Sequence, residues 1–265
     1  MSARDSLGDR MKGYEVASRT VLPHRLPVII RVDGKAFHTY TAECERPFDQ
    51  KLSDVMFDTA KELCKRIQGA QLAYTQSDEI SILVHGYKKF DSQVWFDGQV
   101  QKMASVAAGI ASSHFTAESW RIWHHPDIDK IDAIAPAVFD ARAFVVPEAD
   151  VCNYFLWRQQ DAMRNSVQML ARSMYSHRQC DGKNIVEMKQ MILDKKDPSY
   201  PLGWESLQLG WQRGLTWRRP FTPDEVRFPT LPQYAHCQSN WTQGVVLFSE
   251  HRDYVNNLLR LEDEE

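Results

Sequence analysis

The chain has 265 residues, of which 43% are hydrophobic and 25% are charged, and its formal net charge is −3. This composition excludes a disordered chain, and no apolar run approaches the ~18 residues that a membrane-spanning helix needs. Five scattered cysteines and an N-terminus without an apolar core segment argue against a disulfide framework and a signal peptide. We therefore expect a globular protein of the cytoplasm.

Short apolar runs alternate with helical patterns in the first part of the chain. Residues 28–32 are β-branched and are followed by Asp33-Gly34, which predicts a buried strand that ends in a turn. The spacing of apolar residues predicts a helix over 48–68. Two strands, 71–74 and 80–84, are predicted to form a hairpin across a polar link.

A helix over 92–118, rich in Ala and Ser, and a strand over 137–146 complete this part of the chain. The order βαββαβ is typical of a ferredoxin-like α+β fold, in which an antiparallel sheet carries its helices on one face. We assign residues 1–150 to this core. We expect additional C-terminal helices in an extension over 151–219 of the same domain, and a peripheral segment over 220–265.

A further helix, predicted over 154–177, has two distinct faces. Its apolar stripe consists of Leu156, Met163, Val167, Leu170 and Met174. Its polar stripe consists of Arg158, Asp161, Asn165, Gln168 and Arg172. A helix from residue 182 to about 193 follows, and the region 155–190 carries more Lys and Arg than Asp and Glu. This pattern fits an RNA-binding face and an ordinary solvated helix face equally well.

Carboxylates are predicted to meet at one edge of the sheet. Asp33 ends the first strand, and Asp78 and Glu79 lie at the tip of the hairpin whose second strand pairs with the first in a ferredoxin-like fold. Gathered carboxylates repel one another unless a cation offsets them, and two Mg²⁺ ions would suit a nucleotidyl transfer. Taken singly, Asp-Gly and Ser-Asp-Glu are also common turn sequences.

Four blocks carry a resemblance to a known family. They are Arg31-Val32-Asp33-Gly34-Lys35-Ala36-Phe37-His38, Ala73-Tyr74-Thr75-Gln76-Ser77-Asp78-Glu79-Ile80-Ser81, Phe139-Asp140-Ala141-Arg142 and Trp157-Arg158-Gln159-Gln160-Asp161. In this order they resemble the tRNA-His guanylyltransferase family. The resemblance implies a palm-type catalytic domain, 3′-to-5′ addition of nucleotides to the 5′ end of tRNA after activation by ATP or GTP, and a homotetramer.

The resemblance also implies roles for particular residues. Asp33, Asp78 and the Gly34 carbonyl would bind both Mg²⁺ ions, and Glu79 would be an essential neighbouring carboxylate. The residues that would contact the nucleotide are Asp33, Gly34, Lys35, Ala36, Phe37, His38, Arg46, Asp49, Ser77, Asp78, Lys102 and Asn165. Lys102 would contact a phosphate, and Gln101 is the alternative for that position. With the resemblance, the basic side chains expected to contact RNA are Arg158, Arg164, Arg172 and Lys183.

One departure from the family pattern bears on the substrate. Where the eukaryotic members read His-Ile-Asn, this chain reads Met163-Arg164-Asn165, which is similar to the bacterial and phage-type members associated with repair of 5′-truncated tRNAs. Two alternatives remain open. One is another palm-type enzyme, such as a nucleotide cyclase or cyclic dinucleotide synthase, and the other is a non-catalytic ferredoxin-like RNA-binding protein.

Overall fold

The predicted order of elements is present in the computed structural model. The structure describes residues 6–42, 44–86, 92–123, 136–195, 215–218, 237–238, 241–244 and 246–259. Between residues 28 and 145 the long elements are β1 (Val28–Gly34), α3 (Gln50–Arg66), β2 (Ala70–Gln76), β3 (Glu79–Val84), α4 (Val100–Trp123) and β4 (Phe139–Val145). The βαββαβ order is therefore confirmed.

The strands form one antiparallel sheet in the order β4-β1-β3-β2-β5-β7-β6. The part β4-β1-β3-β2 is the expected ferredoxin-like sheet, with β1 and β3 at its centre. The strands β5 (Leu215–Arg218), β7 (Trp241–Gly244) and β6 (Cys237–Gln238) extend it beyond β2. The sequence did not predict this extension, because these strands are only two to four residues long.

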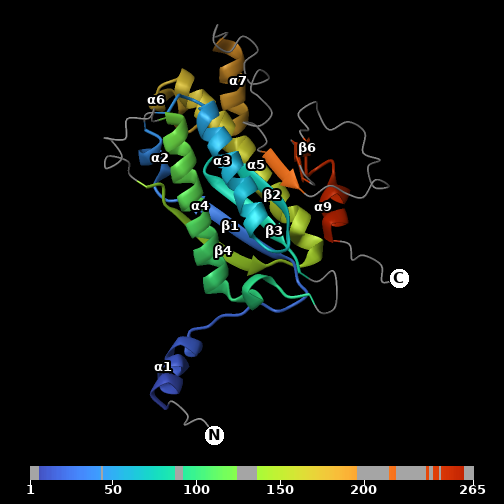
Figure 1. Cartoon of the computed structure of the whole chain (residues 1–265). Helices are drawn as coiled ribbons and strands as arrows, with labels where there is room; N and C mark the ends of the chain where they lie inside the picture. The colour runs from blue at the N-terminus through green and yellow to red at the C-terminus, as the bar shows by residue number, and fades with distance from the viewer. Residues whose placement is uncertain are drawn as a thin grey trace.

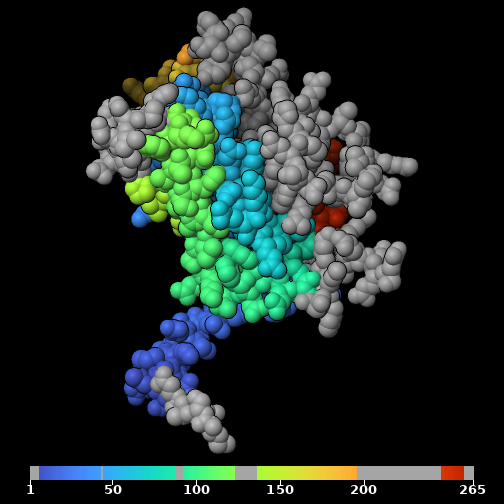
Figure 2. Space-filling view, viewed as in Figure 1, coloured from blue at the N-terminus to red at the C-terminus, as the bar shows by residue number. Residues whose placement is uncertain are grey.

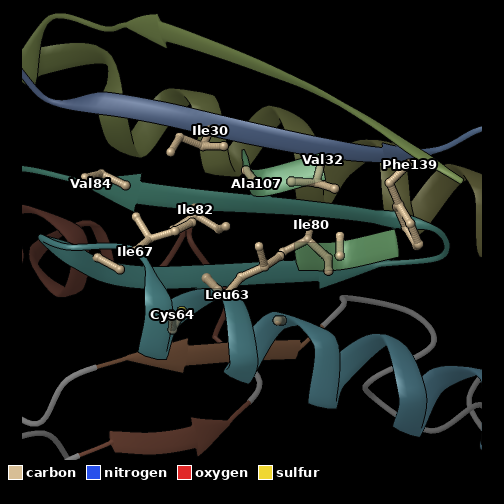
Figure 3. Packing of buried hydrophobic residues seen from close by; sticks show 14 of the residues in the cluster. Ile30, Val32, Leu63, Cys64, Ile67, Ile80, Ile82, Val84, Ala107 and Phe139 are labelled. Carbon is tan, nitrogen blue, oxygen red and sulfur yellow. The ribbon is translucent and has the colours of Figure 1, made fainter. Parts of the chain in front are cut away.

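Helices α3 and α4 cover one face of the sheet (Figure 1) and bury alternate residues of its strands. Figure 3 shows this packing, in which Ile30, Val32, Ile80 and Ile82 meet the helices. Ala107 of α4 is fully buried, which lets that helix approach the strands closely. Each buried Ile or Val contributes about 1.5–3 kcal/mol relative to an exposed one. Side chains of the same two helices form much of the molecular surface in Figure 2.

Helix α3 is shorter at both ends than the predicted helix 48–68, and α4 begins and ends later than the predicted helix 92–118. Both differences have local causes. Asp49 caps α3 by accepting a hydrogen bond of 2.9 Å from the backbone N–H of Leu52. Helix α4 begins at Val100 instead of residue 92, because the separate turn η1 (Trp95–Gly98) holds Phe96 and Asp97 in the left-handed region.

Helix α5 (Glu148–Met174) packs on the opposite face of the sheet. Its first half contacts Ile29 and Leu83, and its second half packs against α6 (His177–Cys180) and α7 (Ile185–Lys195). The additional helices are therefore present, although α5 starts earlier than residue 154 because Glu148 and Asp150 suit a helix N-terminus.

The described end of the chain contributes to the core on this second face. Phe248 and Val255 are fully buried there, the latter in α9 (Arg252–Leu259). Gln159 of α5 fixes the segment by donating to the Val246 carbonyl and accepting from the Phe248 amide. Residues 246–259 thus differ from the peripheral segment expected over 220–265, and most of 220–245 lies outside the described residues.

Helix α1 (Ser6–Ala17) is fully described and buries none of its residues; it projects from the body of the molecule in Figure 1. Two short elements remain, the turn η1 given above and α2 (Phe37–Tyr40), which follows β1 directly. Within the described ranges, no helix is long and apolar enough to cross a bilayer.

Candidate active site

The end of β1 and the β2–β3 turn meet at one edge of the sheet. The backbone N–H of Gly34 donates a hydrogen bond of 3.0 Å to the carbonyl oxygen of Asp78. In the sheet register, Asp33 lies between Glu79 on β3 and Asp140 on β4. The structure therefore brings together Asp33, Asp78 and Glu79, as the topology predicted, and adds Asp140 to the same row.

Burial and mutual repulsion perturb these carboxylates. Burial, and after it the charge of Asp78, raises the pKa of Asp33 above its ordinary value of 3.8, and the nearby Arg31 lowers it. Burial also raises the pKa of Glu79, and the charge of Arg158 opposes that effect. A site that disfavours its own negative charges is suited to bind a cation.

The loop after Asp33 is held by close packing. A Cβ on Gly34 would lie 2.3 Å from the Phe37 ring, so only glycine fits there. Ala36 has a φ of 55°, in the left-handed region, and the amide of Lys35 donates to the Val138 carbonyl at 2.8 Å. The Phe37 ring is buried among the rings of Tyr40, Phe115 and Phe139. The loop therefore has one defined backbone course, with Lys35 and His38 exposed.

A cavity of about 290 Å³ opens beside this loop. It lies between the β2–β3 turn, the start of α3 and the middle of α5. Its lining includes many of the residues that the resemblance assigned to the nucleotide: Phe37, His38, Arg46, Asp49, Ser77, Asp78 and Asn165. Residues separated by more than 120 positions in the sequence thus form one pocket at the carboxylate edge.

The apolar part of the cavity was not predicted from the sequence. Leu52 and Met56 of α3 and Ala162 and Met169 of α5 line it. These residues have helical spacing, which predicts that one face of each helix is covered. The spacing does not tell whether the core of the protein or a bound ligand covers that face. An apolar lining with a few polar groups is typical of a site for a small molecule.

Arg46 and Asp49 shape the wall of this cavity. Asp49 is buried, and its two carboxylate oxygens accept hydrogen bonds of 2.9 and 3.0 Å from the backbone N–H groups of Leu52 and Glu45. Arg46 precedes a cis peptide bond to Pro47 and donates to the Thr41 carbonyl at 3.1 Å. Asp49 therefore fixes the 45–49 loop, and Arg46 places a cation at the cavity.

Lys102 lies away from the predicted nucleotide site of its own chain. It is in the first turn of α4, with its ammonium nitrogen 5.9 Å from the centroid of the Phe96 ring. The contact of α4 with Phe37 is made by Phe115, and the helix rises about 20 Å between Lys102 and that point. The expected phosphate contact by Lys102 is therefore not supported by this structure.

The basic side chains assigned to RNA differ in exposure. Arg164 and Arg172 are exposed on α5, and Arg164 pairs with Asp161 at 2.9 Å. Lys183 is also exposed and lies 3.3 Å from Glu187. Arg158 is only 6% exposed, because its guanidinium pairs with the buried Glu79 at 2.8 Å. The expectation that Arg158 contacts RNA is therefore corrected: its partner is Glu79, a carboxylate of the edge that holds Asp33 and Asp78.

A second row of side chains lies beside the carboxylate row and was not predicted. In the sheet register Arg31 of β1 lies between Arg142 of β4 and Ser81 of β3. Arg142 is exposed and forms an ion pair of 3.4 Å with Asp140. The signal was the alternation Arg-x-Asp in β1 and Asp-x-Arg in β4, which puts both charges of each strand on one face. Both arginines thus lie on the same face of the sheet as Asp33, with Arg142 exposed on the edge strand β4 and Arg31 half-buried beside it.

The donor atoms at this edge fit a magnesium ion in part. Within the described residues, no group of three or more His, Cys, Asp or Glu side chains is placed to hold a metal by itself. Asp33, Asp78 and the Gly34 carbonyl supply hard oxygen atoms from a cluster whose charges repel. Mg²⁺ suits such a set, because it is bound through one or two carboxylates and takes further ligands from water and substrate phosphates.

Comparisons with known proteins show one family among the proteins that this chain resembles. A family model described as tRNAHis guanylyltransferase matches residues 8–147. A bacterial tRNA(His) guanylyltransferase-like protein in complex with ATP is 38% identical, with a TM-score of 0.81 and coverage of 97% of this chain and 100% of that chain. A structure of the same description in complex with GTP is 37% identical, with a TM-score of 0.74 and coverage of 97% and 100%.

A similar sequence is also found among curated proteins. The tRNA(His) guanylyltransferase of Debaryomyces hansenii is 31% identical over 143 residues, which are 53% of this chain and 51% of that protein. The chain thus spans about half of the length of this relative.

Proposed function

This chain belongs to the tRNAHis guanylyltransferase family, and from that premise we propose that it is a magnesium-dependent nucleotidyltransferase that adds nucleotides to the 5′ end of tRNA in the 3′-to-5′ direction. The observation that carries the proposal is that Asp78 lines a cavity of about 290 Å³ and that a backbone hydrogen bond from Gly34 to Asp78 holds the neighbouring Asp33 next to this wall. A nucleotide in that cavity would have its phosphates next to both carboxylates.

Asp33, Asp78 and the Gly34 carbonyl would hold two Mg²⁺ ions in this proposal. Bound Mg²⁺ supplies charge neutralisation for the phosphates and aligns the attacking and leaving oxygens. Glu79 keeps a third negative charge next to Asp33. The N–H groups of Gly34 and Lys35 already donate to backbone carbonyls, so the N–H groups of residues 36–38, at the start of α2, are the ones proposed to bind the triphosphate.

The cavity is the proposed site for the base and ribose of the nucleotide. Met56 and Met169 offer apolar surface to the base, and the Asn165 amide can hydrogen-bond to its polar edge. That similar structures were determined with ATP and with GTP supports a site that accepts a purine nucleotide. We infer that ATP or GTP activates the 5′ end of the tRNA here.

The tRNA would lie over the open part of the sheet. Arg31 and Arg142 place positive charge beside the carboxylates, where a 5′ phosphate has to come. The exposed Arg164 and Arg172 of α5, and Lys183 between α6 and α7, would add further basic groups to the contact with RNA. Basic surface pooled across a homotetramer, which the resemblance implies, would add to it.

A binding function without catalysis fits the fold less well. Ferredoxin-like RNA-binding modules stack bases on exposed aromatic residues of the central strands. Here Ile29 and Leu83 occupy the corresponding face and are buried beneath α5. The carboxylate row also disfavours a nucleic-acid phosphate unless cations are bound.

The test is an extension assay with defined RNA. Purified protein is incubated with labelled tRNA, either full-length or lacking one 5′ nucleotide, together with ATP, each NTP and Mg²⁺. We expect extension of the truncated tRNA by the nucleotide that matches the opposing base. Guanosine added only to full-length tRNA-His would overturn the repair specificity, and a cyclic nucleotide formed without RNA would support the cyclase alternative. Asp78→Ala should abolish extension, and full activity of this variant would contradict the site.

A further inference from the structure

Arg158 connects α5 to the carboxylate edge through a buried ion pair. Its Nη1 lies 2.8 Å from Oε2 of Glu79, and the two residues are 6% and 7% exposed. Its Nη2 lies 3.5 Å from Asp161 on the next turn of the helix, and its guanidinium carbon is 3.6 Å from the centroid of the Trp157 ring. The guanidinium is therefore fixed from several sides.

The second carboxylate oxygen of Glu79 is also engaged. The hydroxyl of Ser81 donates to Oε1 of Glu79 at 3.4 Å, and the same hydroxyl shares a hydrogen bond of 2.9 Å with the Tyr154 hydroxyl. Tyr154 and Arg158 are one turn apart on α5, so the two hydrogen-bond routes to Glu79 begin on the same helix. Both oxygens of Glu79 thus have a defined direction before any substrate binds.

The buried ion pair between Arg158 and Glu79 does not by itself explain why these residues are present, because such pairs add little to stability. A buried carboxylate without its cationic partner is strongly unfavourable, and a pair of nonpolar residues of similar size would be at least as stable as the ion pair. The pair also lies at the reacting edge, since Glu79 is opposite Asp33 in the sheet register. Helix α5, whose Arg158 pairs with Glu79, also supplies Ala162 and Asn165 to the cavity wall.

We propose that Arg158 is a positioning residue: with Ser81 and Tyr154 it fixes the orientation of the Glu79 carboxylate beside Asp33, and it connects that carboxylate to α5, which lines the nucleotide cavity. This inference rests on the proposed function and adds a role for a side chain that does not touch substrate. Its absence should slow the chemical step and leave nucleotide binding nearly intact, because the cavity lining itself is unchanged.

The test compares Arg158→Gln, Arg158→Lys, Glu79→Gln and the double variant Arg158→Gln/Glu79→Gln. The matched control is Arg121→Gln, an exposed arginine of α4 that pairs with Glu118 at 2.8 Å and does not line the nucleotide cavity. The rate of transfer is measured by single-turnover extension of a truncated tRNA that carries a 5′-triphosphate. This substrate is already activated, so the activation step does not contribute to the measured rate. The KM for the incoming nucleotide and the melting temperature are measured for every variant.

We expect Arg158→Gln to lower the transfer rate by about 100-fold, the effect of a small misplacement at a reacting centre, with the nucleotide KM changed by less than about 3-fold. Arg158→Lys should recover part of the rate, because it keeps the charge and loses the fork geometry. The double variant should be no slower than Glu79→Gln. Arg121→Gln should keep the wild-type rate.

Three results would overturn the proposal. They are a wild-type rate in folded Arg158→Gln, rate losses that multiply in the double variant, and a loss in Arg158→Gln that is entirely in KM. If Arg158→Gln does not fold, Ser81→Ala removes one support of Glu79 and must lower the rate at an unchanged KM, and an unchanged rate contradicts the proposal. An inactive wild-type protein would instead count against the proposed function.

Discussion

The backbone N–H of Gly34 donates to the carbonyl oxygen of Asp78 at 3.0 Å, which ties the end of β1 to the β2–β3 turn. Because this bond is between backbone atoms, it fixes the neighbouring Asp33 and Asp78 carboxylates near each other whatever their protonation. The fold, and not a metal ion, therefore assembles the two carboxylates, and their repulsion is a cost of folding that a cation can remove.

The first prediction concerns this cost. The folded-state pKa of Asp33 is raised above 3.8, so ionisation of Asp33 lowers the free energy of unfolding as the pH rises from 3.8 through the folded value. Asp33→Asn should therefore melt at a higher temperature than the wild type at pH 7 in EDTA. The difference should shrink as the pH falls toward 3.8.

Magnesium provides the control for this prediction. Millimolar Mg²⁺ should raise the melting temperature of the wild type and have a smaller effect on Asp33→Asn, since ligand binding to the folded state alone stabilises it. Equal melting temperatures of the two proteins in EDTA would show that Asp33 is not under electrostatic strain.

The second prediction concerns the loop after β1. Gly34→Ala puts a Cβ 2.3 Å from the Phe37 ring, which has to move. We expect a loss of about 1–3 kcal/mol in the free energy of unfolding, as for other overpacked sites, together with a large loss of extension activity. Urea denaturation and the extension assay measure the two effects.

Two further variants make this comparison specific. Gly109→Ala is the matched control, because a Cβ on this exposed glycine of α4 meets no atom within 4 Å, and it should gain about 0.5–1 kcal/mol from helix propensity. Gly34→Ala/Phe37→Leu should recover part of the stability, since the smaller side chain makes room. No recovery would mean that Phe37 is not the cause.

The third prediction concerns the nucleotide cavity. Asn165→Ala should raise the Kd for ATP or GTP about 10-fold, because the loss of one hydrogen bond to a ligand costs about 1.4 kcal/mol. Isothermal titration calorimetry with each nucleotide checks this. The control is Asn153→Ala on the same helix, where the amide bonds to Asp150 outside the cavity. An unchanged Kd for Asn165→Ala would show that the base of the nucleotide does not bind beside Asn165 in this cavity.

The sequence predicted that the carboxylates meet at one edge of the sheet because the relevant information is local. Asp33 follows a β-branched run and Asp78 lies in a two-residue turn, so the βαββαβ order alone brings them together. The role of Arg158 could not be predicted in this way. The helical pattern placed Arg158 on the polar stripe of α5. In the structure Arg158 is buried against Glu79, which lies 79 positions earlier in the sequence, and no local pattern indicates that contact.

Lys102 and the end of the chain show the same limit. Helical periodicity does not tell which end of α4 lies at the carboxylate edge, and Lys102 is at the other end. The strands after β4 are short, and their place in the sheet depends on pairing with β2. Phe248 is buried only because α5 and Tyr74 form a surface for it.

The last prediction tests whether this distant segment supports the site. Phe248 is fully buried, and its ring lies 5.5 Å from the rings of both Tyr74 and Phe155. Phe248→Ala should cost about 3–5 kcal/mol of unfolding free energy, as expected for a large cavity in a core. His251→Ala, an exposed change three residues further, should cost less than about 0.5 kcal/mol.

The same variant separates stability from catalysis. Because α5 lies between Phe248 and the carboxylate edge, loosening its support should also lower the transfer rate at temperatures where Phe248→Ala is still folded. Circular dichroism establishes the folded range, and the rate is then compared with that of His251→Ala in that range. A normal rate in folded Phe248→Ala would show that Arg158 and Ser81 hold Glu79 without help from the end of the chain.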